Sequence, residues 1–292
     1  MVESTRDVPA QSKEAPSLET LRNAIRRGAV FLLLAAMIVG FSLAQPAFIN
    51  INNLMSILQA VSVVAIIGAG VSVTLAINGF DLSVGAVAAS SVMAASYAMI
   101  VLGLNAWQTV PLVLAFGALV GLANAFLIVR LKVPDLLATL ATMFLLTGLQ
   151  LIPTAGRSIS VGLILPDGST ASGKYDPAFL TIGRSSMFGI VPLPVILMAI
   201  VALVLFILTE KTRLGRLIYA TGGNETAARL AGANVDRIKT FAYVLSGTLA
   251  ALGGIIVAAR VGRGDVSSGA SLLMDSVAGR ADRFCGSGPA PT

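Results

Sequence analysis

The sequence contains no histidine and only one cysteine, Cys285. A disulfide framework within the chain is therefore excluded, and zinc, haem or iron–sulfur sites built on histidine and cysteine nearly so. The usual pairing of a nucleophile with a histidine base is also absent. We expect no catalytic residues, no metal site and no enzyme activity in this chain.

Charge is scarce too. Charged residues make up 12% of the 292 positions, and hydrophobic residues make up 56%, whereas a soluble domain carries about 25% charged residues. The net charge of +6 forms no basic tract that would indicate nucleic-acid binding. The apolar residues gather in runs of about 20, the length that a helix needs to cross a bilayer. This composition predicts an all-α polytopic membrane protein.

Seven apolar runs predict about seven transmembrane helices, preceded by a polar, mobile tail at residues 1–27. The first run exceeds the core of a usual signal peptide, which favours its retention as a membrane helix. The predicted spans are 28–45, 56–77, 84–102, 110–129, 136–153, 187–208 and 241–259.

The placement of basic residues predicts the orientation. Lysine and arginine concentrate in segments 1–27, 130–135 and 210–240, which lie on one side of the predicted membrane. An excess of these residues marks cytoplasmic segments, so we expect a cytoplasmic N-terminus. The external segments before residue 260 carry few: Arg157, Lys174 and Arg184.

Segment 210–240 is the longest predicted cytoplasmic connection. We expect a turn at residues 222–223, followed by a helix of two turns. Asn224 is a good N-cap for it, Glu225 suits the positive end of the helix dipole, and Gly232 can end it in left-handed geometry.

The faces of this short helix differ. Ala227, Leu230 and Ala231 form an apolar stripe, while Glu225 and Arg229 are spaced to pair at i, i+4. So short a helix is marginal in water and needs a surface to dock on. Two interpretations stay open at this point: a cap packed on its own bundle, or a knob that enters a groove on a soluble partner.

One aspartate lies in the turn "NGFDLSVG", the only charge across the second, third and fourth predicted spans. Its transfer to the bilayer centre costs about 2.5–3.5 kcal/mol, so we expect Asp81 at a helix end, at the membrane edge or in a water-filled cavity. It can cap a helix that begins near Leu82. Alternatively, the turn lines the translocation pathway or a gate through Asn78, Asp81, Ser83 and Gly85. Gln59 and Asn124 are further polar candidates for the pathway.

Two other patterns resemble functional motifs, but we expect neither to have a specific function. "GSTASGKY" imitates a phosphate-binding loop, but it ends in tyrosine and lacks the preceding strand, so we expect no ATPase site in this chain. It lies in the external loop 154–186, which is either a docking surface or a hairpin connector. Gly117, Gly121 and Ala125 recur every four residues, which favours close helix packing within the chain over a dimer seam.

Three stretches resemble the permease subunit of bacterial ABC importers for sugars, in the ribose, xylose, galactose and autoinducer-2 branch. They are "GFDLSVGAVAA", "VPDLLATLATMFLLTGL" and "TRLGRLIYATGGNETAARLAGANVDRIKTFAYVLSGTLAALGGIIVAARVG". The resemblance covers most of residues 30–278. It implies an inner-membrane permease that dimerises, as a homodimer or a heterodimer, with cytoplasmic ATP-binding subunits and a periplasmic sugar-binding protein. It also implies that the chain binds no cofactor and that a partner hydrolyses ATP.

The resemblance further implies that the short cytoplasmic helix is the coupling helix of this family, on which the ATPase acts. The residues expected to couple are Gly222, Gly223, Asn224, Glu225, Ala227, Ala228, Arg229 and Gly232. A secondary transporter or facilitator for a small polar solute is the alternative; it would need buried ionisable couplers, for which Asp81 is the one candidate.

The permease domain is expected at residues 28–278. Residues 279–292 are polar and rich in glycine and proline, where the resemblance predicts further membrane helices. We expect this atypical tail to result from a frameshift or truncation, with a short natural variant as the alternative.

Overall fold

The computed structural model describes residues 18–187 and 189–266. These residues are mainly helical, as the composition predicts. They divide into two units, one ending at Leu54 and the other beginning at Met55. The tail at 279–292 and the first seventeen residues lie outside the described part.

The first unit contains α1 (Leu18–Ala44) and a 3₁₀ turn, η1 (Pro46–Ile49). Helix α1 begins before the expected span 28–45, so residues 18–27 are helical although they were expected in the mobile tail. Apolar side chains along its second half, such as Phe31 and Leu43, are exposed, as they would be on a helix that faces lipid.

An apolar helix lies within or across each of the seven expected spans, although the bounds differ. Five helical segments of the described residues are long and apolar enough to cross a membrane, and two apolar helices are shorter, Leu33–Ala44 and Val84–Ile100. Helices α4 and α7 each end in a π-helical extension, η2 and η4. The elements are α2 (Ile51–Ala76), α3 (Val84–Ile100), α4 (Ala106–Ala125), η2 (Phe126–Arg130), α5 (Asp135–Leu149), α7 (Leu193–Phe206), η4 (Ile207–Lys211) and α10 (Val235–Val261).

Short elements fill the connections. The predicted span 187–208 starts too early, because Met187 pairs with Val191 in a small antiparallel hairpin. Helix α7 begins only after Pro192, where a proline next to the first turn costs no hydrogen bond. The short elements are η3 (Ile152–Thr154), α6 (Pro177–Arg184), β1 (Ser186–Met187), β2 (Val191–Pro192), α8 (Arg213–Gly223) and α9 (Glu225–Leu230).

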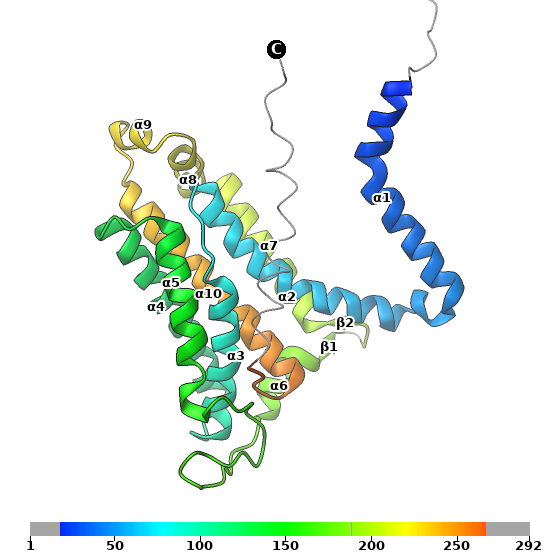
Figure 1. The fold of residues 1–292 in the computed structure, drawn as a ribbon, viewed down its shortest axis with the longest axis vertical. Helices are drawn as coiled ribbons and strands as arrows, with labels where there is room; N and C mark the ends of the chain where they lie inside the picture. Colours follow the sequence, from blue (N-terminus) through cyan, green and yellow to red (C-terminus); the bar gives the residue numbers. More distant parts are fainter. Residues whose placement is uncertain (1–17, 188, 267–292) are drawn as a thin grey trace, which may run out of the picture. The chain divides into compact units, whose positions relative to one another are not determined.

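Helix α10 lies at the centre of the second unit, where it packs on α3, α4 and α6 (Figure 1). Its contact with α4 depends on small residues. A Cβ added at Gly121 would overlap the carbonyl of Tyr243, and one added at Gly247 would overlap the carbonyl of Gly117. The glycine ridge therefore serves packing within the chain, as expected, and brings the two backbones into contact.

The two ends of the second unit carry different structures. Helices α8 and α9 lie at one end, and the long connection between α5 and α6 lies at the opposite end (Figure 1). This external connection is packed on the bundle: Ile159 forms a β-bridge with Gly264, and the Gly173 N–H donates to the carbonyl of Ile100 (3.1 Å). The backbone of the phosphate-loop imitation is thus engaged in packing, and no helix follows it until Pro177.

Candidate functional site

Helix α9 forms as the local sequence predicts. The Asn224 carboxamide oxygen accepts the backbone N–H of Ala227 at 2.9 Å, which caps the first turn. At the other end, Gly232 adopts φ 85° and donates its N–H to the carbonyl of Arg229 at 3.1 Å. Both ends are therefore fixed by side chains and backbone geometry within a stretch of nine residues.

The expected turn at Gly222 and Gly223 is wrong, because both glycines lie in the last turn of α8. The break comes at Asn224, whose extended backbone (φ −156°, ψ 102°) ends α8 and begins α9. Gly222 has a packing role instead. A Cβ there would overlap the carbonyl of Ala76, whereas Gly223 has open space beside it.

An ion-pair network connects α9 to the start of α10. We call its members, Glu225, Arg229, Asp236 and Lys239, the tether. Glu225 accepts from Arg229 at 3.2 Å, as the i, i+4 spacing predicts, and from the Lys239 ammonium at 2.6 Å. Arg229 also donates to Asp236 at 2.9 Å. The hydrogen bond from Lys239 is the main cause that holds the pKa of Glu225 below its ordinary value. Exposed pairs are individually weak, but here they connect two helices through shared partners.

Removing Lys239 tests this connection through the pKa of Glu225. The Lys239→Gln variant loses the ammonium that stabilises the carboxylate, so we expect this pKa to rise toward its ordinary value. Because the folded pKa is lowered, the tether stabilises α9 above the unfolded pKa and is lost as pH falls through the folded pKa. Titration of the Glu225 carboxyl by ¹³C NMR in detergent measures both effects, and an unchanged pKa in the variant would contradict the contact.

An apolar stripe forms part of the exposed surface of α9, beside polar and charged side chains. Ala228 is buried toward the bundle, whereas Ala227, Leu230 and Ala231 face outward. Leu230 is 86% exposed, and it lies only five residues before the first residue of α10. Both interpretations of the helix thus hold in part, since it packs on its own bundle and also presents an unpaired apolar stripe.

A second polar cluster lies inside the bundle around Asp81. The carboxylate accepts from the Ser83 N–H (3.0 Å), the Ser83 hydroxyl (2.6 Å) and the Ser246 hydroxyl (2.8 Å). Asn124 donates to the Ser83 oxygen (2.9 Å), and Thr142 donates to the Asn124 carbonyl oxygen (2.6 Å). We call these five residues the buried hub. It joins the turn before α3 to α4, α5 and α10, and satisfied networks of this kind fix one arrangement of a core.

The buried hub corrects the expectation for Asp81. The residue is 4% exposed, so its carboxylate is surrounded by protein rather than by solvent. Helix α3 begins at Val84, later than the expected start near Leu82, and its N-cap Ser83 makes no side-chain capping bond. Asp81 therefore closes a turn and binds α10, because a buried carboxylate needs donors from wherever they are available.

The four residues proposed for the gate do not form one group. Ser83 belongs to the buried hub, and Gly85 is buried in the first turn of α3. Asn78 is exposed in left-handed geometry at φ 58°. It lines a separate cavity of about 330 Å³, to which Glu225 and Lys239 of the ion-pair network also contribute.

One face of α10 contacts both regions. Lys239 binds Glu225 of α9, and Ser246 binds Asp81. Between them, the Tyr243 hydroxyl lies against Gly79, where an added Cβ would fall 2.7 Å away. The spacings of four and three residues place these three side chains on the same side of the helix. The sequence did not predict a role for these three side chains, because none of them belongs to a motif or interrupts an apolar span with a charge.

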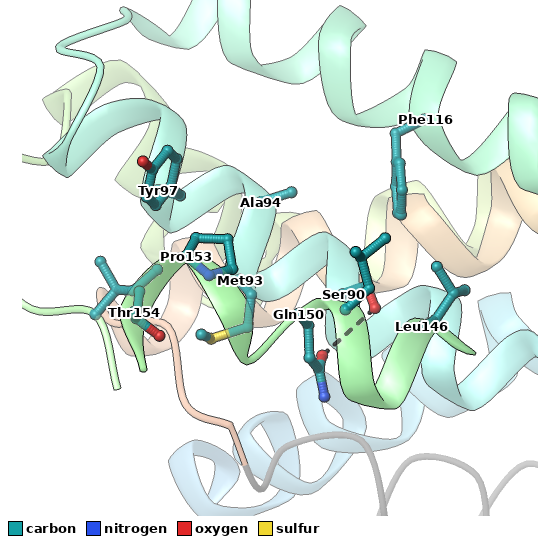
Figure 2. A pocket seen from close by; sticks show the side chains of 11 residues that line it. Ser90, Met93, Ala94, Tyr97, Phe116, Leu146, Gln150, Pro153 and Thr154 are labelled. Carbon is teal, nitrogen blue, oxygen red and sulfur yellow. Dashed lines mark hydrogen bonds between the residues drawn. The ribbon is translucent and has the colours of Figure 1, made fainter. Parts of the chain in front are cut away.

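A cavity of about 240 Å³ lies between α3, α4 and α5, next to the long connection between α5 and α6 (Figure 2). Its wall is mainly apolar, with Met93 and Phe116 among the lining residues. Four side chains with polar groups interrupt it, and Tyr97 is one of them (Figure 2). Ser90 and Gln150 lie 3.4 Å apart, and the buried Thr154 hydroxyl has no hydrogen-bond partner within the described part of the chain.

The remaining polar candidates have structural partners. Asn124 belongs to the buried hub, while the Gln59 amide donates to the carbonyl of Gly183. Both residues could be identified from the sequence because each is an amide side chain within an apolar span. Thr142 and Ser246 carry a weaker signal, since serine and threonine in helices often bond only their own preceding turn.

Comparison with known proteins gives the family. Residues 53–278 match the family described as "Branched-chain amino acid transport system / permease component". The chain belongs to this family. The chain is 38% identical to the ribose import permease protein of Haemophilus influenzae, over 85% of this chain and 73% of the relative. It is also similar to the L-arabinose transport system permease protein of Escherichia coli, at 33% identity over 80% of this chain and 67% of the relative.

A third relative is the galactose/methyl galactoside import permease protein of Haemophilus influenzae, 31% identical over 87% of this chain and 77% of the relative. No solved structure matches the chain significantly. Membership in a permease family confirms the expected multi-pass membrane transport component. The roles expected for individual residues stay predictions.

Proposed function

We propose that the chain is the membrane-spanning permease subunit of an ABC importer that moves a small carbohydrate across the bacterial inner membrane. It performs no chemistry and binds no cofactor; a cytoplasmic partner hydrolyses ATP. The observation that carries this proposal is α9, a helix of two turns that is tethered to the bundle and offers an exposed apolar stripe. A permease whose energy came from an ion gradient would have no need of such a docking element.

The docking surface consists of the apolar stripe of α9 and the residues at the end of α8 that lead into it. Its apolar side chains enter a groove on the ATP-binding subunit, while the tether holds the helix at a fixed distance from α10. In this proposal the N-terminus and α9 lie in the cytoplasm, which the excess of lysine and arginine in segments 1–27 and 210–240 supports. The coupling residues are Gly222, Gly223, Asn224, Glu225, Ala227, Ala228, Arg229 and Gly232.

Movement passes from α9 into the membrane along α10. A displaced α9 pulls on Lys239, and α10 transmits the shift to Tyr243 and Ser246, about 10 Å further along the helix. Ser246 then moves against Asp81. The turn from Asn78 to Gly85 acts as the gate in this proposal. Its exposed end lines the same cavity as the tether, and its buried end is bonded to α10 through Asp81 and Ser246.

The substrate class follows from the relatives rather than from the family description, since the three relatives above are named for ribose, arabinose and galactose. In this proposal the sugar passes the cavity shown in Figure 2, where Ser90 and Gln150 offer polar groups. Its few polar groups can hold a sugar only weakly, because a tight sugar site needs a partner for most hydroxyls. Selectivity then resides in a periplasmic sugar-binding protein that docks on the external connection, and a second permease copy completes the pathway.

Transport in reconstituted vesicles tests the proposal against a secondary transporter. The chain is combined with its ATP-binding and sugar-binding subunits, and uptake of labelled ribose, arabinose and galactose is measured. We expect uptake of at least one sugar that requires ATP and is unaffected by ionophores. Uptake without ATP that collapses with an ion gradient would support the alternative instead.

A further inference from the structure

A groove of about 760 Å³ lies between the end of α4 and the start of α10, outside the regions discussed so far. Its mouth carries Arg130, the last residue of η2, and Arg237, in the first turn of α10. Both arginines are exposed. It opens at the same end of the bundle as α9.

The two guanidinium groups are available for a ligand. Neither Arg130 nor Arg237 has an ion-pair or hydrogen-bonded side-chain partner among residues 18–187 and 189–266. The one carboxylate that lines the groove, Asp236, is held by Arg229 at 2.9 Å. The charge of Arg130 also acts on the Asp236 carboxylate, but neither arginine is held by a side-chain hydrogen bond within the described residues. Two such cations at one mouth favour an anion that both can contact.

The walls below the arginines are mainly apolar, with Thr240 as a polar exception. Leu122 of α4 and Phe126 of η2 continue the groove on one side, and Phe241 and Val244 continue it along α10. Leu122 lies eight residues before Arg130, about 12 Å along a helix, and Val244 lies about 10 Å beyond the arginine of its own helix. Both walls run from the charged mouth toward the middle of the spans.

We propose that this groove binds an anionic phospholipid. The phosphate lies between the Arg130 and Arg237 guanidinium groups, and an acyl chain lies along Leu122, Phe126 and Val244. Basic pockets between membrane helices on the cytoplasmic side favour such headgroups. The assignment rests on the proposed function only for the cytoplasmic side. A second protein copy would fill the apolar walls but would leave both cations without an anion.

Lipid binding to the purified, delipidated full-length chain tests the site without the ATPase. Phosphatidylglycerol and phosphatidylcholine with identical acyl chains are added in detergent, and bound lipid is counted by native mass spectrometry. We expect at least fivefold tighter binding of phosphatidylglycerol, and loss of that preference in the double variant Arg130→Ala/Arg237→Ala.

The matched control removes two other exposed arginines, Arg213→Ala/Arg216→Ala on α8, and should keep the preference within twofold. The double lysine variant of Arg130 and Arg237 should retain part of it, which separates charge from misfolding. Equal binding of both lipids, or an unchanged preference in the alanine variant, would overturn the proposal. Displacement of phosphatidylglycerol by millimolar inorganic phosphate would assign the site to a soluble anion and overturn it too. None of these readouts depends on transport, so the proposed function can fail separately.

Discussion

Replacing Leu230 with aspartate is expected to weaken assembly with the ATP-binding subunit at least about 30-fold while the membrane bundle stays folded. The side chain is 86% exposed and contributes to no core of the chain, so the bundle loses little. At the docked interface, a buried charge without a partner costs at least about 2 kcal/mol, which corresponds to about 30-fold weaker binding. Co-purification of the ATP-binding subunit and the midpoint of a binding titration measure the loss.

Ile164 provides the matched control. It is also an exposed, branched apolar residue (54%), but it lies in the external connection at the opposite end of the bundle. Ile164→Asp should leave binding of the ATP-binding subunit within twofold. If both variants bind equally well, the α9 stripe is not the docking surface.

Replacing Asp81 with alanine is expected to lower stability and to disconnect transport from ATP hydrolysis. The change removes the acceptor of three hydrogen bonds and leaves the Ser83 and Ser246 hydroxyls buried without it. Unsatisfied buried groups cost about 1–3 kcal/mol each, so we expect a loss of about 3 kcal/mol in the free energy of unfolding. Urea unfolding in detergent gives the stability, and the ratio of sugar transported to ATP hydrolysed in vesicles gives the coupling.

Asp167 separates burial from turn geometry. It accepts from the Ser169 N–H (2.9 Å) and hydroxyl (2.7 Å), the same pattern that Asp81 makes with Ser83. Asp167 is exposed, however, so water replaces it. We expect Asp167→Ala to change stability by less than about 0.5 kcal/mol and to leave coupling intact. Equal effects of the two substitutions would show that the buried hub has no special role.

Features set by neighbouring residues could be predicted from the sequence. The cap at Asn224, the end at Gly232 and the pair of Glu225 with Arg229 all depend on contacts within one or two turns. The apolar spans could also be found, because their length is set by the membrane. The close α4–α10 packing was foreseen in kind from the glycine spacing, although not which helix would be the partner.

Features set by distant residues could not be predicted. Gly222 looks like a turn residue, and only the carbonyl of Ala76 beside it explains why it stands inside a helix. Asp81 looked like a cap at the membrane edge, since nothing local reveals the hydroxyl of Ser246, 165 residues away. Lys239 and Tyr243 carried no signal for the same reason.

Helix α10 transmits movement from α9 to the buried hub in this proposal, because it is central, closely packed and bonded to both. A rigid helix with two discrete attachments is the kind of element that can carry coupling between separate sites. The attachments are few enough to test one by one.

Site-directed crosslinking at Leu230 tests the central claim most directly. In a Cys285→Ser background the chain has no other cysteine, so Leu230→Cys reacts alone with a short bifunctional thiol–amine reagent. The account predicts a crosslink to the ATP-binding subunit whose yield changes with bound nucleotide, and none from Ile164→Cys. Labelling of Leu230→Cys only from the periplasmic side, or no crosslink in an ATP-hydrolysing complex, would contradict it.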